Sequence, residues 1–185
     1  MPLYAQIKAD GYVSQMPSWY YIEQMDQGMW DYVLHNRINM SYDFSTSFVG
    51  VLQVRNRLIT GQMIKDIPGY KALIERDEGV LDMSFNPLSG DAYALNTTID
   101  RLWLDLYAGN FQARIGRQRI NWGQAMVWNP NDLFNAYSFF DFDYPERPGT
   151  DGLRFQLFTG MASRIEAVVK MDRLNRKTMA MLYRF

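Results

Sequence analysis

The sequence WDYVLHNRINMSYDF, which covers residues 30–44, decides the fold class. Its even positions are apolar or aromatic apart from Asn36, and its odd positions are polar or charged apart from Val33. Such alternation places the two sets on opposite faces of a β-strand, whereas a helix would scatter them around its circumference. At about 15 residues, the segment is much longer than the roughly five or six residues of an ordinary strand. This length is typical of a tilted barrel strand that projects beyond a membrane.

The same alternation recurs along the chain and predicts about eight strands. The other alternating segments are residues 7–13, 48–58, 101–107, 111–116, 153–157, 164–170 and 179–185. The connections are of two kinds, tight turns at 45–47, 108–110 and 159–161 and long loops near 15–28, 61–96 and 121–150. Short turns that alternate with long loops are typical of an antiparallel outer-membrane barrel, with both chain ends on the periplasmic side. The short connection at 172–176 departs from this pattern. We therefore expect residues 1–185 to form a single all-β domain, or part of a larger barrel.

A soluble β-sandwich or barrel also alternates apolar and polar positions, so it remains an alternative. Two features favour the membrane. The polar faces are rich in arginine, which suits a water-filled interior. Aromatic residues recur near the predicted strand ends, where they would form interfacial girdles. These residues are Trp30, Phe44, Phe48, Tyr107, Phe111, Tyr183 and Phe185.

Composition excludes several other classes of protein. The chain has 185 residues with 19 Lys+Arg against 20 Asp+Glu, and this balance argues against nucleic acid as a partner. There is no Cys and a single His, which removes disulfides and Cys-based or His-rich metal sites. Mean hydropathy is -0.29, and no apolar run approaches the roughly 18 residues of a membrane helix. Residues 1–6 lack the features of a signal peptide, and they fit either the remainder of a removed leader or an ordinary start.

Seven arginines on the polar faces are the candidate solute-binding residues of a barrel lumen. They are Arg37, Arg55, Arg57, Arg101, Arg114, Arg154 and Arg164. A guanidinium group forks around carboxylates and phosphates, so a ladder of arginines would guide anionic solutes. The alternative is that they pair with acidic residues on the same faces, such as Asp105 and Glu166, and plug the lumen. Arg117 and Arg119 change parity relative to Arg114, which indicates a bulge or the strand's end near Gly116.

The aromatic stretch 121–150 is the candidate constriction loop. A long segment without a clear period tends to be functional when it is ordered, and this many aromatics predict that it packs against the inside of a barrel wall. The constriction-loop candidates are Trp122, Trp128, Asn129, Asp132, Phe134 and Tyr137. The alternative is a surface loop held together by its own aromatic cluster.

Catalysis and metal binding have little support in the sequence. His35 has Ser41 on the same face, but six residues separate the two and no contact is expected. Asp141, Asp143 and Glu146 offer oxygen atoms for calcium without the glycine-bearing spacing of a calcium loop. The chain has no glycine-rich phosphate loop, nucleophile elbow or cofactor fingerprint. We therefore expect no enzyme activity, no catalytic residues, no metal and no cofactor.

The region between Arg114 and Arg154 resembles a known family. RIGRQ at 114–118 is followed by NWG at 121–123 and WNPND at 128–132, and the chain returns through PGTDGLR at 148–154. This pattern resembles the outer-membrane porin-like proteins of Gram-negative bacteria and, more distantly, alginate-export-type porins. The resemblance implies an outer-membrane location, contact with lipid, and passive passage of small solutes. The expectation that these solutes are anionic or sugar-like rests on the arginines of the polar faces.

Such proteins are usually longer, so the resemblance implies the N-terminal part of a larger barrel. The final MLYRF, however, resembles the assembly signal of a complete barrel, and both interpretations remain open. The distinction matters because an eight-stranded barrel is filled by its own side chains. The main alternative function is a non-conducting barrel that binds an envelope protein through its long loops. A weaker alternative is a soluble carbohydrate-binding β-domain, and a homo-oligomer is compatible with the membrane interpretations.

Overall fold

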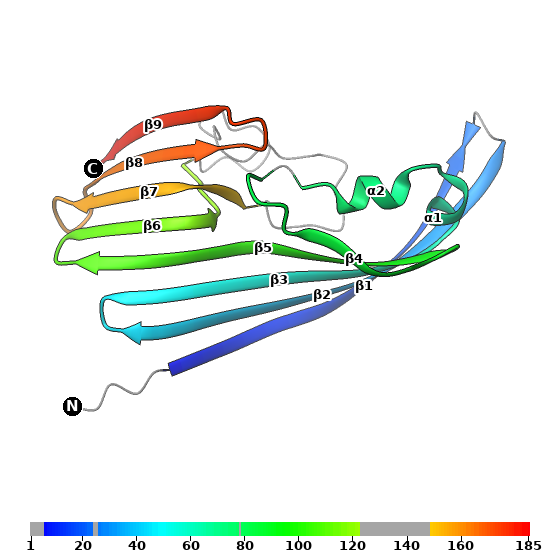
Figure 1. Ribbon diagram of the computed structural model, residues 1–185, viewed down its shortest axis with the longest axis horizontal. Helices are drawn as coiled ribbons and strands as arrows, with labels where there is room; N and C mark the ends of the chain where they lie inside the picture. The colour runs from blue at the N-terminus through cyan, green and yellow to red at the C-terminus, as the bar shows by residue number, and fades with distance from the viewer. Residues whose placement is uncertain (1–5, 24–25, 78, 123–148) are drawn as a thin grey trace.

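The computed structural model describes residues 6–23, 26–77, 79–122 and 149–185, which form an all-β chain (Figure 1). Within these ranges, nine strands make one antiparallel sheet and two short helices lie between the third and fourth strands. The strands are β1 (Gln6–Ile22), β2 (Gln27–Ser45), β3 (Phe48–Gly61), β4 (Ser84–Gly90), β5 (Tyr93–Ala108), β6 (Phe111–Gln118), β7 (Thr150–Phe158), β8 (Arg164–Met171) and β9 (Lys177–Arg184). The helices are α1 (Gln62–Asp66) and α2 (Tyr70–Glu75).

The sheet is a meander with one added strand. Its order is β1-β2-β3-β5-β6-β7-β8-β9, and β4 pairs with β5 away from this path. One edge of β5 pairs with β3 along most of its length. On the other edge, β4 pairs with residues 93–98 and β6 with residues 102–108. Therefore β4 continues the sheet where β6 ends.

The two ends of the sheet carry different connections. The tight turns β2–β3, β5–β6 and β7–β8 lie at one end, together with the start of β1 and the end of β9 (Figure 1). The helices lie toward the other end (Figure 1). The tight turn at 172–176, between β8 and β9, also lies at this other end. The expected alternation of connections is present only in part: β1–β2, which joins Ile22 to Gln27, and β8–β9 are short where long loops were expected, and the long connections lie between β3 and β5 and between β6 and β7.

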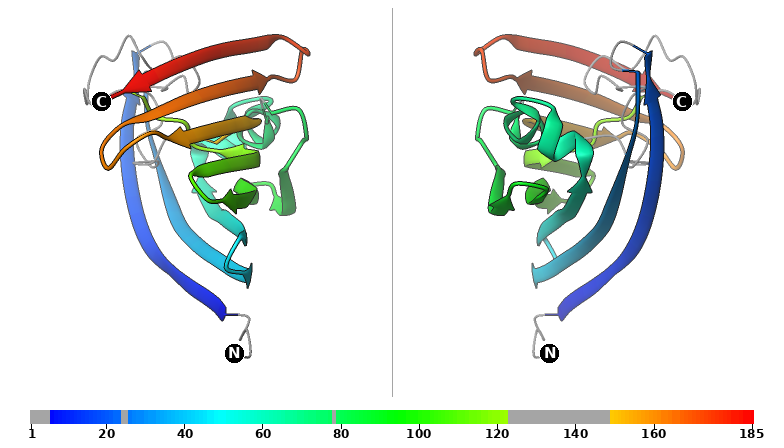
Figure 2. Two further views of the ribbon diagram at one scale, coloured as in Figure 1. Left: turned by 90° about the vertical axis from the view of Figure 1, so that its left-hand side faces the viewer. Right: turned by 90° about the vertical axis from the view of Figure 1, so that its right-hand side faces the viewer.

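The sheet is strongly curved (Figure 2), and the side chains of its two faces have opposite chemistry. Because residues directly opposite each other in an antiparallel ladder share a face, register rows reveal each face. One row contains Leu104, Ile115, Leu153, Val169 and Met179, and the row beside it contains Asp105, Arg114, Arg154, Val168 and Ala180. We call the first the convex face and the second the concave face.

The convex face exposes large apolar side chains over most of the sheet. They include Ile38, Met40, Phe44, Leu102, Leu104, Leu106, Phe111, Ile115, Leu153, Phe155, Leu157, Ile165, Met179, Met181 and Tyr183. Among the described residues, 15 buried side chains are polar or charged and only seven are hydrophobic. This distribution is inverted relative to a soluble protein, in which charged residues are almost never fully buried unless paired.

Two small apolar clusters anchor chain segments on the concave face. Ile64 of α1 packs with Ile59 of β3 and Ala94 of β5. The second cluster lies toward the C-terminal strands, where Ile120 and Trp122 pack against Val168 of β8. The concave face is thus covered in part by α1 and by the residues that follow β6.

Several predicted boundaries were wrong. The expected loop near 15–28 is mostly strand, because β1 continues to Ile22 and pairs residue by residue with β2. Pro17 lies within β1, and proline is tolerated on an edge strand, where one side of the ladder is unpaired. The expected loop near 61–96 contains α1, α2 and β4, which makes nine strands instead of about eight. The long predicted strand at 30–44 is confirmed within the 19-residue β2.

The described sheet is open. No ladder joins β1 to β9 within the described residues, so each of these strands has one unpaired edge. The all-β antiparallel prediction is confirmed, whereas a closed barrel is not formed by these strands alone. Neither described helix is long or apolar enough to cross a membrane.

Candidate functional site

All seven candidate arginines lie on the concave face. Arg37 is directly opposite Arg55 on β3, and Arg57 is opposite His35 on β2. Arg101 follows on β5, Arg114 and Arg154 face each other across β6 and β7, and Arg164 lies on β8 two residues before Glu166. The sequence prediction that these side chains share one face is confirmed. Their hydrogen bonds divide them into two groups.

Arg37 anchors the first group through a buried ion pair. Its Nη1 donates to Oδ2 of Asp100 at 2.7 Å, and both side chains are almost fully buried. Nη2 of Arg37 donates to Gln53 at 2.7 Å and Nε donates to Asn39 at 3.0 Å. Arg55 lies 3.7 Å from the other oxygen of Asp100. A buried carboxylate therefore draws two arginines together at the centre of β2, β3 and β5.

Sequence reasoning missed Asp100 because a bulge reverses its orientation. Gln53 pairs with Arg101 and Val54 pairs with Ile99, so Asp100 is the extra residue of β5. A regular strand would place Asp100 on the same face as Leu102, but the bulge turns its carboxylate toward Arg37 on the concave face. The adjacent polar residues Asp100 and Arg101, which break the alternation, were the available signal.

Arg57 and Arg101 complete the first group with neutral partners. Arg57 donates to Oδ1 of Asn96 at 3.1 Å, and Asn96 donates to Ser84 of β4 at 3.2 Å. Arg101 donates to Gln53 at 3.0 Å. Polar contacts thus run from β3 through β5 into the added strand β4.

The second group is centred on Asp105 of β5. Arg114 makes a bidentate pair with its two oxygens at 2.7 and 2.8 Å. Gln112 and Trp103 donate to the same carboxylate at 2.8 and 3.0 Å. The guanidinium of Arg114 also lies 4.5 Å from the ring centre of Trp103, which is a cation–π contact. Asp105 is therefore fully engaged.

Glu166 of β8 is the second carboxylate of this group. Nε1 of Trp122 donates to its Oε1 at 2.7 Å, and Nε2 of Gln156 donates to its Oε2 at 2.7 Å. Arg164 lies 3.6 Å from Oε2. Trp122 is thus turned onto the concave face. The remaining constriction-loop candidates, Trp128, Asn129, Asp132, Phe134 and Tyr137, lie outside the described residues.

Arg117 belongs to neither group. It pairs in register with Asp151 of β7 and with Leu102, whose side chain is on the convex face. The preceding Gly116 has a φ of 123°, in the region that favours glycine, and β6 continues to Gln118. The predicted irregularity at Gly116 is therefore present, but the strand does not end there.

His35 and a group of acidic residues were also considered from the sequence, and neither was assigned a role. His35 is buried and packs against Tyr12, with ring centres 5.5 Å apart. The described residues contain no group of three or more His, Asp or Glu side chains that could hold a metal ion. Asp141, Asp143 and Glu146, weighed above as calcium ligands, lie outside the described residues.

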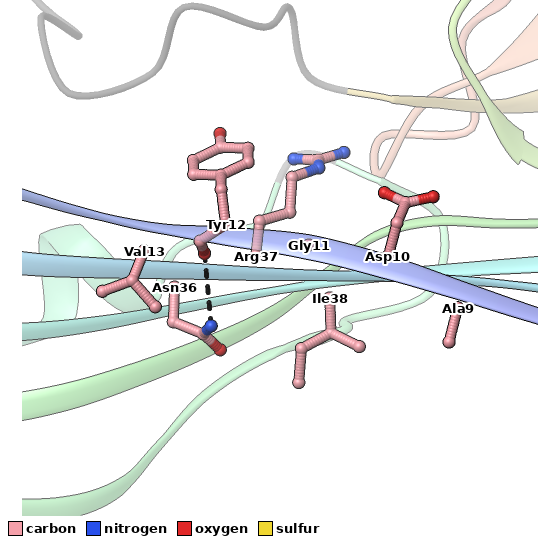
Figure 3. Close-up of a pocket in the computed structure, with 8 residues that line it drawn as sticks. All are labelled: Ala9, Asp10, Gly11, Tyr12, Val13, Asn36, Arg37 and Ile38. Atoms are coloured by element: carbon pink, nitrogen blue, oxygen red, sulfur yellow. Dashed lines mark hydrogen bonds between the residues drawn. The ribbon is translucent and has the colours of Figure 1, made fainter.

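A shallow hollow lies over the free edge of β1 (Figure 3). Asp10, Tyr12 and Arg37 line it from one side of the sheet, and Val13 and Ile38 line it from the other (Figure 3). Because the hollow wraps around a strand edge, it is open rather than enclosed.

Comparisons with known proteins do not assign the chain to a family. No protein-family model, curated protein or solved structure matches the chain. The two faces of the sheet are therefore the basis for a proposal of function.

Proposed function

We propose that this chain forms part of the wall of an outer-membrane β-barrel channel through which small, anionic or sugar-like solutes pass. The observation that carries this proposal is the inverted polarity of the curved sheet. Its convex face exposes rows of Leu, Ile, Phe and Met, and its concave face buries arginines and carboxylates. A lipid-facing exterior and a polar interior are the defining requirements of a membrane barrel.

The dimensions of the convex face support a bilayer. Strands β6–β9 contain eight or nine residues each, close to the roughly 9–11 residues of a tilted membrane strand. At the end with the tight turns, Phe44 and Phe48 pack together with ring centres 4.8 Å apart. Toward the other end, Trp19 is directly opposite Trp30 and both are well exposed. Phe44 and Phe48 at the first of these limits match an interfacial girdle, whereas Trp19 and Trp30 at the second lie on parts of β1 and β2 that would project beyond the bilayer.

A polar row crosses the convex face between these limits. Asn36, Asn56 and Thr97 share one register row, in which Asn56 donates to Asn36 at 3.2 Å and Thr97 donates to Asn56 at 2.9 Å. Between this row and Phe44 and Phe48, toward the tight turns, β2, β3 and β5 present outward only apolar residues, Tyr42 and Gly50. On the other side of the row, the same strands continue and carry α1, α2 and β4. We interpret this row as the external limit of the hydrocarbon region.

The open edges support closure by further pairing. β1 is a 17-residue edge strand, and its alternating faces continue those of β2. A long unpaired edge is a liability in water, and exposed backbone groups are not tolerated in lipid. The path from β1 to β9 contains eight strands in alternating directions, so β9 is antiparallel to β1. Closure of β1 on β9, or on an even number of added strands, would keep every ladder antiparallel.

A non-conducting barrel is the second candidate, and the ion pairs favour it. Arg37 is bound to Asp100 and Arg114 is bound to Asp105, so part of the arginine charge is neutralised within the concave face. An interior closed by such pairs would leave the long external connections as the functional surface. Its expected partner is an envelope protein.

Two measurements on the detergent-refolded chain separate these candidates. A heat-dependent shift in SDS gel mobility would support a stable barrel, and ion conductance in planar bilayers would then support the channel. A gel shift without conductance would favour the partner-binding barrel. A chain that stays folded and monodisperse without detergent would overturn the membrane proposal.

A further inference from the structure

Arg154 occupies the middle of β7 on the concave face. It is directly opposite Arg114 on β6 and Val168 on β8. Like charges directly opposite each other in an antiparallel ladder are destabilising. Arg114 has its own carboxylate in Asp105, but Arg154 has no described residue of opposite charge beside it in the register row.

The two nearest carboxylates are occupied by other donors. Both oxygens of Asp105 accept from Arg114, and both oxygens of Glu166 accept from Trp122 or Gln156. Within the described part of the chain, no hydrogen bond or ion pair reaches Arg154, and its Nε is shielded from water without a partner. A guanidinium left in this way carries an unmet cost, which an anion would remove.

The row beside Arg154 on the concave face contains two glycines. Gly116 is directly opposite Gly152, so neither β6 nor β7 contributes a side chain at this level. Trp103 on β5 and Lys170 on β8 border the two glycines in the same row. The buried amide of Gln118 lies over these glycines and donates to the carbonyl of Gly152 at 3.2 Å. The row next to Arg154 thus contributes an amide, an aromatic ring and a second cation.

We infer that Arg154 and Arg114 form a binding site for the oxyanion group, a carboxylate or sulfate, of a small solute. Both hydrogen bonds to Asp105 use Nε and Nη2 of Arg114, which leaves Nη1 to contact the same anion. The planar guanidinium of Arg154 matches an oxyanion bidentately, and the bound charge relieves the repulsion between the two arginines. The inference deepens the proposed function and rests on it for the solute's route, whereas binding itself is measurable without conductance.

Calorimetric titration of the folded chain in nonionic detergent tests the site. The probes are sodium sulfate, sodium glucuronate and neutral glucose, with sodium chloride held constant. We expect saturable binding of glucuronate and sulfate but not of glucose. Arg154→Gln should weaken binding about tenfold or more. Arg154→Lys keeps the charge but cannot make the bidentate contact, so its affinity should lie between those of the wild type and Arg154→Gln. Lys177→Gln is the matched control because it removes one exposed positive charge from the start of β9.

The outcomes are distinguishable. Equal binding by the wild type and Arg154→Gln, or equal losses in Arg154→Gln and Lys177→Gln, would overturn the site. Absence of anion binding in a folded wild type would also overturn it. Sulfate binding without glucuronate binding would restrict the ligand to a free inorganic anion and overturn the solute assignment. Circular dichroism and gel mobility establish folding, and Arg154→Lys provides the comparison if Arg154→Gln does not fold. If the folded chain binds the anion but does not conduct, the binding site stands and the proposed channel function is overturned.

Discussion

Arg117 at the end of β6 and Asp151 at the start of β7 are directly opposite in the ladder and joined by two hydrogen bonds of 2.8 and 3.0 Å. Arg117 also donates to Asp77 at 2.6 Å, to the carbonyl of Leu81 at 2.7 Å and to that of Ile99 at 3.4 Å. These five bonds use every N–H of the guanidinium. They hold the segment that leads into β4 at the point where β6 leaves the edge of β5.

Loss of Arg117 is expected to destabilise this junction strongly. Arg117→Met leaves the carboxylates of Asp77 and Asp151 near each other without their shared cation, and breaking a buried pair in this way costs about 3–5 kcal/mol. Denaturant unfolding of the refolded chain measures the change. Adding Asp151→Asn to Arg117→Met should recover part of the loss. Arg173→Met is the matched control, because its guanidinium makes a single exposed hydrogen bond of 3.4 Å to Asp77. Equal effects of the two Arg→Met changes would contradict this account.

The convex face provides a second prediction. Leu104 lies in the middle of the outward-facing leucines of β5, so Leu104→Arg should cost about 2–4 kcal/mol in a bilayer near its midplane. Leu174→Arg makes the same chemical change in the turn between β8 and β9, outside the apolar band, and should be nearly neutral. Unfolding free energies of both variants in liposomes test the contrast. A neutral Leu104→Arg would remove the main support for lipid contact.

The sequence predicted the faces of the sheet better than its register. Alternation within one strand places Arg37 and Arg114 on the same face without knowledge of the neighbouring strands. The orientation of Asp100 depends on a bulge against Gln53 and Val54; the local pattern shows a break in the alternation at Asp100 and Arg101 but not the partner residues that set the bulge. The strand after Val13 was missed for the same reason, since its residues are ordered by partners on β2, such as Trp30 opposite Trp19. The periodicity of apolar residues within one strand shows which side chains share a face. The ends of a strand depend instead on its pairing with neighbouring strands.

The stability of the turn between β8 and β9 is expected to depend on pH through Asp172. Desolvation is the largest single influence on Asp172 and raises its pKa, but the backbone and side-chain hydrogen bonds from Arg176 and the backbone N–H of Leu174 together outweigh it and lower the pKa. A depressed pKa in the folded state means that the carboxylate stabilises the turn above its unfolded pKa. This contribution is lost as the pH falls through the folded value. Carboxyl-carbon NMR should report a pKa for Asp172 below the ordinary aspartate range.

Arg176 provides the internal test of that titration. Its Nε donates to Oδ2 of Asp172 at 2.7 Å, so Arg176→Gln should raise the pKa of Asp172 toward its ordinary value. Arg173→Gln, a neighbouring charge that donates elsewhere, should change it much less. If both variants shift the titration equally, general electrostatics and not the specific hydrogen bond would set the pKa.

Ion selectivity is the prediction closest to function. If the concave face lines a conducting lumen, Arg154→Gln should reduce the preference for anions, because it removes a positive charge that no described carboxylate neutralises. The double variant Arg114→Gln and Arg154→Gln should reduce it further and leave Asp105 without its bidentate partner, which shifts the balance toward cations. The reversal potential across a salt gradient measures both changes, with Lys177→Gln as the control for loss of a charge outside the lumen. Unchanged selectivity in a conducting double variant would exclude these two arginines from solute discrimination, since an arginine that lines the path contributes its charge to every anion that passes.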